Sequence, residues 1–129
     1  MSGNLSRFLL GLALALPLSA FGATHIVQVG QNSGGGAAFA FNPQTLAIPS
    51  GDTVTFVNNS GGFHNAVSDD GGTTFSSGAA SSAAWSYETP PITADIGYFC
   101  TIHGSAGNNM FGSITVSPTP VSLQSFSVD

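Results

Sequence analysis

The chain has 129 residues, of which 5% are charged and 42% hydrophobic, and its formal net charge is −5. This length suits one domain with its own core. Arg7 is the only Lys or Arg, which excludes a basic surface for nucleic acid or for anionic membrane lipids. The acidic balance favours a basic partner, because opposite charges speed encounter. The alternative is that the charge serves solubility alone.

The first segment has the features of a secretory signal peptide. Arg7 precedes an apolar run over residues 8–16, and small residues lead up to Gly22. We expect a signal peptide over residues 1–22 and a periplasmic or otherwise extracytoplasmic location. The run is short for a membrane span, so we expect no membrane insertion of the mature domain. Cleavage after Ala23 and a retained membrane anchor are the alternatives.

The mature chain reads as short strands separated by turn residues, without a long amphipathic helix. This pattern is typical of an all-β sandwich or barrel. In chain order, strands are predicted over residues 24–29, 41–48, 53–58, 85–88, 97–100 and 112–117. A loop with a helical turn is predicted over residues 74–84. The domain is expected to cover residues 23–117, and residues 118–129 form a C-terminal tail.

The predicted strands contain enough apolar side chains to form a core. A domain of this size buries most of its apolar surface, so we expect it to stay folded without a metal, unlike a zinc finger. The core candidates are Val54, Phe56, Trp85, Tyr98, Phe99, Ile114 and Val116.

Side chains that can bind a metal ion cluster in the sequence around Cys100, the only cysteine. His103 and Met110 follow it, and His64 lies upstream. A thiolate, two imidazoles and a weak thioether form the ligand set of a blue-copper electron-transfer site. A buried inert thiol, or a catalytic thiol with His103 as its base, is the alternative for Cys100.

The spacing of these residues suggests a loop between two strands. Cys100 is expected to end one strand, His103 to lie on the turn and Met110 to close the loop. Gly104 and Gly107, which lie between His103 and Met110, allow tight backbone geometry in this loop. Packing in the core is the alternative role for Met110.

Three further polar residues have open roles. His25, in the first strand, is expected to be structural or exposed, with a second metal role as the alternative. Asp69 and Asp70 form either an acidic docking patch or a solvated turn.

Several segments together resemble the small bacterial cupredoxins of the plastocyanin and pseudoazurin type. The resemblance covers about residues 39–117 and rests on Phe41-x-Pro43, Ile48–Phe56, Phe63–Val67, Tyr98-x-Cys100-x-x-His103 and Met110–Val116. It implies a single-domain Greek-key β-sandwich with one mononuclear type 1 copper site.

The resemblance also assigns roles to single residues. His64, Cys100 and His103 would be equatorial copper ligands, and Met110 the axial one. Asn65 would join the two ligand loops by a hydrogen bond to Thr101, although neither residue is itself a ligand. One departure concerns the loop, since plastocyanin-like members usually place Met five residues after the loop His, whereas Met110 lies seven after His103.

These features predict an exported, monomeric one-electron carrier that is not an enzyme. The resemblance implies that electrons pass through the edge of His103, where the surface is uncharged over Gly104, Ser105, Ala106 and Phe111. The partner would be a basic redox protein, such as a c-type cytochrome. The alternative is an envelope copper-binding or delivery protein. A copper enzyme related to nitrite reductase would need a second metal site, for which only His25 is spare.

Overall fold

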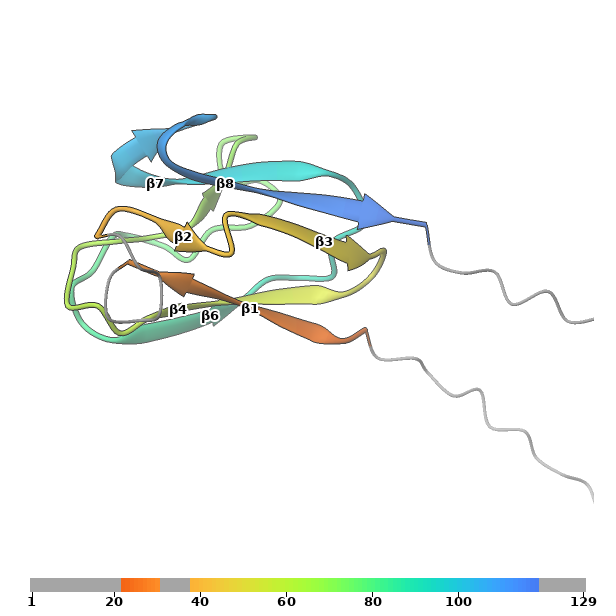
Figure 1. Cartoon of the computed structure of the whole chain (residues 1–129), viewed down its shortest axis with the longest axis horizontal. Helices are drawn as coiled ribbons and strands as arrows, with labels where there is room; N and C mark the ends of the chain where they lie inside the picture. Colours follow the sequence, from red (N-terminus) through yellow and green to blue (C-terminus); the bar gives the residue numbers. More distant parts are fainter. Residues whose placement is uncertain (1–21, 31–37, 119–129) are drawn as a thin grey trace, which may run out of the picture.

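The computed structural model describes residues 22–30 and 38–118. The expected signal peptide, apart from Gly22, and the tail beyond residue 118 lie outside the described residues. The described residues form eight strands (Figure 1): β1 (Thr24–Val29), β2 (Phe41–Asn42), β3 (Thr45–Pro49), β4 (Thr53–Asn58), β5 (Val67–Ser68), β6 (Trp85–Glu88), β7 (Ile96–Ser105) and β8 (Asn108–Ser117).

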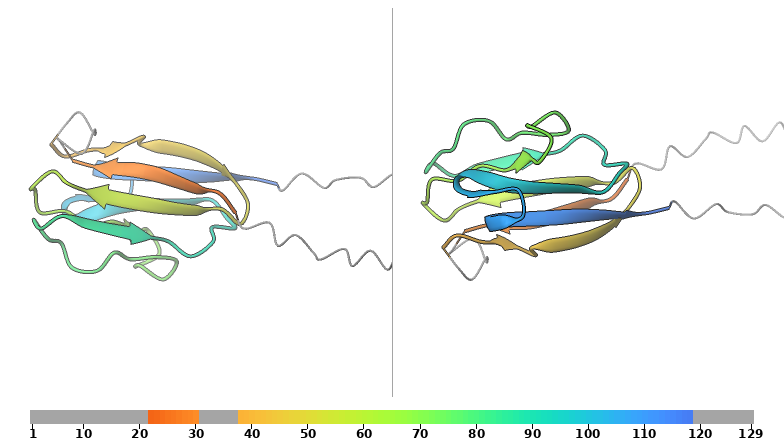
Figure 2. Two further views of the ribbon diagram at one scale, coloured as in Figure 1. Left: turned by 90° about the horizontal axis from the view of Figure 1, so that it is seen from below. Right: turned by 90° about the horizontal axis from the view of Figure 1, so that it is seen from above.

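The strands form two sheets that pack face to face (Figure 2). One sheet has the order β2-β1-β4-β6 and the other the order β3-β8-β7-β5. β1 pairs with β4, and β3 with β8, in parallel, whereas the other pairs are antiparallel. The predicted all-β Greek-key sandwich is therefore confirmed, and a barrel is excluded.

Alternating side chains of the strands form the core between the sheets. In β4, the side chains of Val54, Phe56 and Asn58 are buried, while those between them are partly exposed. Phe56 and Tyr98 meet edge to face across the sandwich, with ring centroids 4.9 Å apart. Four core candidates are buried (Val54, Phe56, Tyr98 and Ile114), whereas Trp85, Phe99 and Val116 are only partly buried.

The segment around Cys100 differs from the predicted loop. β7 continues past Cys100 to Ser105, and β8 begins at Asn108, so His103 and Met110 lie within strands. Pairing is irregular between Phe99 and Gly104 and then resumes, with Gly104 opposite Asn109. The prediction of an open loop was wrong because Gly107, with a positive φ, allows a tight turn that lets the hairpin continue pairing.

The predicted helical turn within residues 74–84 is also wrong. Two isolated bridges pair this segment with the chain around His64 and β5: His64 faces Ser81, and Val67 faces Ser76. These bridges use hydrogen-bonding groups that a helical turn would need for itself.

The two ends of the sandwich are formed by different segments of the chain. β1 begins and β8 ends at one end (right in Figure 1), and the β7–β8 turn lies at the other. Within residues 22–30 and 38–118, the structure has no helix that is long and apolar enough to cross a bilayer.

Candidate metal centre

His64, Cys100 and His103 converge at the end of the sandwich that carries the β7–β8 turn. Cys100 Sγ lies 4.0 Å from His64 Nδ1 and 3.7 Å from His103 Nδ1. The two Nδ1 atoms are 3.2 Å apart. These residues form the one group of three potential metal-binding side chains among the described residues. The structure thus brings together three of the four side chains that the sequence singled out, from segments 36 residues apart.

The arrangement of the three donor atoms fits a single metal ion. First-row metal ions bind imidazole nitrogen and thiolate sulfur at roughly 2.0–2.3 Å, which separates neighbouring donors by roughly 3–4 Å. Burial lowers the pKa of His64, and the charge of His103 lowers it further. Both effects favour the neutral imidazole, the form that binds a metal. The set of two imidazoles and one thiol therefore matches a blue-copper site.

Met110, the fourth predicted ligand, is buried and lines a pocket together with His103. Its side chain is fully buried in β8. With His103, Phe39 and Asn109 it lines a pocket of about 470 Å³. Met110 lies two residues further from His103 than in the usual pattern. The extra residues lengthen the β7–β8 hairpin, and Met110 still lines the same pocket as His103.

Asn65 joins the segment of His64 to that of Cys100. Its Oδ1 accepts a hydrogen bond from the Thr101 backbone N–H at 2.9 Å, and its Nδ2 donates to Thr101 Oγ1 at 2.9 Å. Nδ2 also donates to the Gly78 carbonyl. The Asn65–Thr101 contact predicted from the sequence is therefore present. Because Thr101 follows Cys100 directly, these bonds fix the position of the thiol relative to His64.

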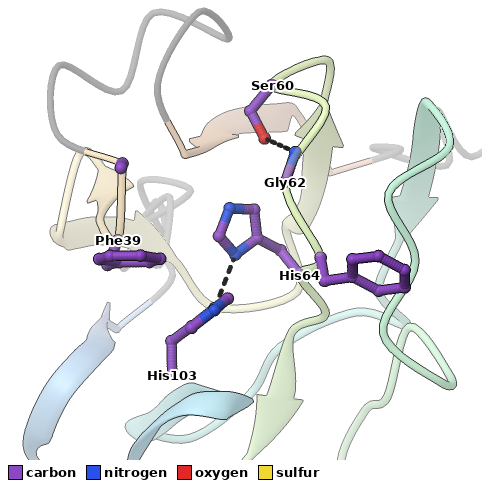
Figure 3. A pocket seen from close by; sticks show the side chains of 7 residues that line it. Phe39, Ser60, Gly62, His64 and His103 are labelled. Carbon is purple, nitrogen blue, oxygen red and sulfur yellow. Dashed lines mark hydrogen bonds between the residues drawn. The ribbon is translucent and has the colours of Figure 1, made fainter.

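A second polar residue, Asn58, organises the turn before His64. Asn58 is fully buried, donates to the Gly62 carbonyl at 3.0 Å and accepts from Ser60 Oγ at 2.6 Å. Ser60 Oγ accepts in turn from the Gly62 N–H (Figure 3). A Cβ at Gly62 would lie 2.6 Å from His64 Nε2, so a larger residue there would have to displace this imidazole. Sequence reasoning missed Asn58, because a strand-ending asparagine has no distinctive motif.

Trp85 also supports His64. It was expected in the core, but it is partly exposed, and its indole N–H donates to the His64 carbonyl at 3.2 Å. An indole ring needs such a partner when its polar edge is covered.

Phe39 is the second residue that sequence reasoning missed. Its ring centroid lies 4.4 Å from that of His103 (Figure 3). Phe39 is 59% exposed and lines a pocket of about 270 Å³ that His64 and His103 also line. His103 is therefore partly covered by an aromatic ring. The only sequence signal was an aromatic residue after the glycine-rich segment.

Comparison with known proteins gives a consistent result. Residues 27–117 match the family model described as copper binding proteins of the plastocyanin/azurin family. Chloroplastic plastocyanin of Chlamydomonas reinhardtii is 39% identical over 113 residues, covering 81% of this chain and 74% of that protein.

Two solved structures are also similar. A purple cupredoxin from Nitrosopumilus maritimus matches with a TM-score of 0.53 and 30% identity, covering 74% of this chain and 99% of the other. A copper-containing nitrite reductase from Thermus scotoductus matches with a TM-score of 0.55 and 27% identity, covering 73% of this chain but 22% of the other. Given this family match and the convergence of His64, Cys100 and His103, the chain belongs to the plastocyanin/azurin family of copper-binding proteins, and its cofactor is copper.

Proposed function

We propose that this chain is an exported one-electron carrier that binds one type 1 copper ion through His64, Cys100, His103 and Met110. The observation that carries the proposal is the convergence of two imidazole Nδ1 atoms and one thiol sulfur within 4.0 Å. Copper, when bound, supplies the change between Cu(I) and Cu(II). Plastocyanin-like relatives support the assignment to electron transfer.

The side chains around the centre suit this role because they restrict movement. Cys100 and Met110 are fully buried, and His64 is 2% exposed. The Asn65–Thr101 bonds hold the thiol in place from outside. A site that rearranges little between two oxidation states transfers electrons with a small energetic cost. We infer that the chain is a carrier rather than an enzyme, in line with the plastocyanins to which it is similar.

The surface above the centre suits brief contact with another protein. Phe39, Phe63 and Ile102 are each more than half exposed, and none carries a charge. Small, uncharged contacts favour weak and fast association. The chain carries six acidic residues and a single Lys or Arg, so we propose a basic redox protein, such as a c-type cytochrome, as the partner.

The proposal is tested by mixing the reduced copper-loaded protein with a basic oxidised cytochrome c and following the haem absorption. We expect rapid oxidation of the protein, with a rate that falls as salt screens the opposite charges. Slow transfer at every salt concentration would contradict the proposal.

A copper-release measurement separates electron transfer from the alternative of copper delivery. An electron carrier retains its ion in the presence of a Cu(I) chelator, because its ligands are buried. Rapid loss of copper to the chelator would instead support a delivery protein.

A further inference from the structure

The beginning of β1 forms a polar cluster at the opposite end of the sandwich from the metal centre (Figure 1). The carboxylate of Asp52 contacts both ends of the segment Ala23-Thr24-His25. Its Oδ1 accepts a hydrogen bond from the Ala23 backbone nitrogen at 3.1 Å, and its Oδ2 lies 2.7 Å from His25 Nε2. One buried carboxylate thus holds the first nitrogen and the imidazole of this segment on the same side of the strand.

The contact with Asp52 determines which nitrogen of His25 is left to bind a metal. An imidazole that donates its Nε2 proton to a carboxylate carries its lone pair on Nδ1. Metal-binding histidines commonly show this pairing, in which a carboxylate orients the ring through the other nitrogen. The His25 side chain is 28% exposed, and Ala23 and Thr24 are exposed, so the segment is open to solvent.

Cleavage after Gly22 would turn the Ala23 nitrogen into a free amino group. The segment would then offer four nitrogens in succession: the amino group, the peptide nitrogens of Thr24 and His25, and Nδ1 of His25. A planar set of four nitrogens is the arrangement that Cu(II) and Ni(II) prefer. Binding replaces one proton on each of the two peptide nitrogens.

We propose that the processed amino terminus, Ala23-Thr24-His25, is a second metal site that binds Cu(II) and is independent of the Cys100 centre. The proposal rests on the cleavage that is part of the proposed export. Occupying the site separates the first residues of β1 from β4, where Ala23 accepts a hydrogen bond from the Thr53 N–H. Pairing of Ile26, Val27 and Gln28 with β4 is unaffected.

The test uses the full chain exported from a bacterial host, with Cys100→Ala so that the other centre does not take up the ion. Mass spectrometry identifies its first residue, and Ni(II) is then titrated into the purified protein. We expect a chain that starts at Ala23 and binds one equivalent of Ni(II) with the yellow absorption of a square-planar nitrogen site.

Two variants examine the ligands separately. His25→Gln removes the imidazole. Thr24→Pro removes one peptide N–H but is tolerated at the first position of a strand. We expect both to weaken Ni(II) binding by at least about tenfold, whereas Ser86→Ala, on the exposed face of β6, leaves it unchanged.

Three results would overturn the proposal: an exported chain that begins at another residue, no square-planar absorption in the parent chain, or the same absorption in His25→Gln. Failure of the proposed electron-transfer function is recognised separately, from the reaction of the chain that retains Cys100 with cytochrome c.

Discussion

At the scale of single residues, Tyr98 lies in the centre of the core and carries a hydroxyl group that is buried there. Its side chain is fully buried and contacts the rings of Phe41, Phe56 and Phe75. Its hydroxyl has no hydrogen-bond partner among the described residues. The ring packs against Gly112, where a Cβ would overlap it. The ring therefore stabilises the core by packing, whereas the hydroxyl forms no hydrogen bond with any of the described residues.

Burial raises the pKa of Tyr98 above its ordinary value of 10.0. Above about pH 10, the unfolded chain loses this proton while the folded protein keeps it. The free energy of unfolding of the copper-free protein should therefore fall by up to about 1.4 kcal/mol per pH unit there. In Tyr98→Phe this fall should be absent, and stability at pH 7 should be equal or higher by about 1 kcal/mol.

Urea unfolding between pH 7 and 11 measures both effects. Tyr87→Phe, at a partly buried tyrosine of β6, serves as the matched control and should retain the alkaline loss. If Tyr98→Phe lost more than about 1 kcal/mol at pH 7, the hydroxyl would have a partner after all.

The residues of the centre differ in how well the sequence predicted them. His64, Cys100 and His103 have side chains whose chemistry is distinctive and whose spacing is readable. Phe39 and Asn58 act through packing and backbone hydrogen bonds. Many positions could supply such contacts, so only the folded arrangement identifies them.

At the scale of elements, Asn65 connects the segment of His64 to the β7–β8 hairpin beside the metal centre, next to the pairing of β5 with β7. Asn65 is 3% exposed and bonds to both the backbone and the side chain of Thr101. Asn65→Ala removes these bonds and leaves the partly buried N–H of Thr101 without its acceptor. We expect copper to pass to a Cu(I) chelator about 10–100 times faster than from the parent protein.

The same variant should lower the free energy of unfolding of the copper-free protein by about 1–3 kcal/mol. Asn108→Ala, at an exposed position of the hairpin, is the matched control and should change neither quantity. Equal release rates for Asn65→Ala and the parent would show that the two segments hold the copper without this connection.

At the scale of the whole molecule, the core and the metal centre are arranged so that the fold does not depend on the metal. Buried side chains from both sheets form one continuous cluster, and Cys100 and Met110 are part of it. We therefore expect the copper-free protein to keep its β-sheet circular dichroism spectrum and to unfold cooperatively on heating. Loss of that spectrum on removal of copper would contradict this prediction.

The sequence predicted the parts of the fold that depend on neighbouring residues better than the parts that depend on contacts between distant segments. The ranges of β1, β4 and β6 agree with the alternation of apolar and polar residues, which is a local property. The parallel pairing of β1 with β4, and the continuation of β7 through His103, depend on contacts between distant segments. The sequence pattern alone does not encode them, although the family resemblance implied the sandwich as a whole.

The central claim is that one copper ion contacts the sulfur of Cys100 together with the two imidazoles. The most direct test adds Cu(II) to the mature protein and records its visible and electron paramagnetic resonance spectra, with Cys100→Ser and the exposed Ser86→Ala in parallel. We predict an intense copper–thiolate absorption in the parent and in Ser86→Ala, and its complete loss in Cys100→Ser. An absorption that is absent from the parent, or that persists without the thiol, would contradict the account.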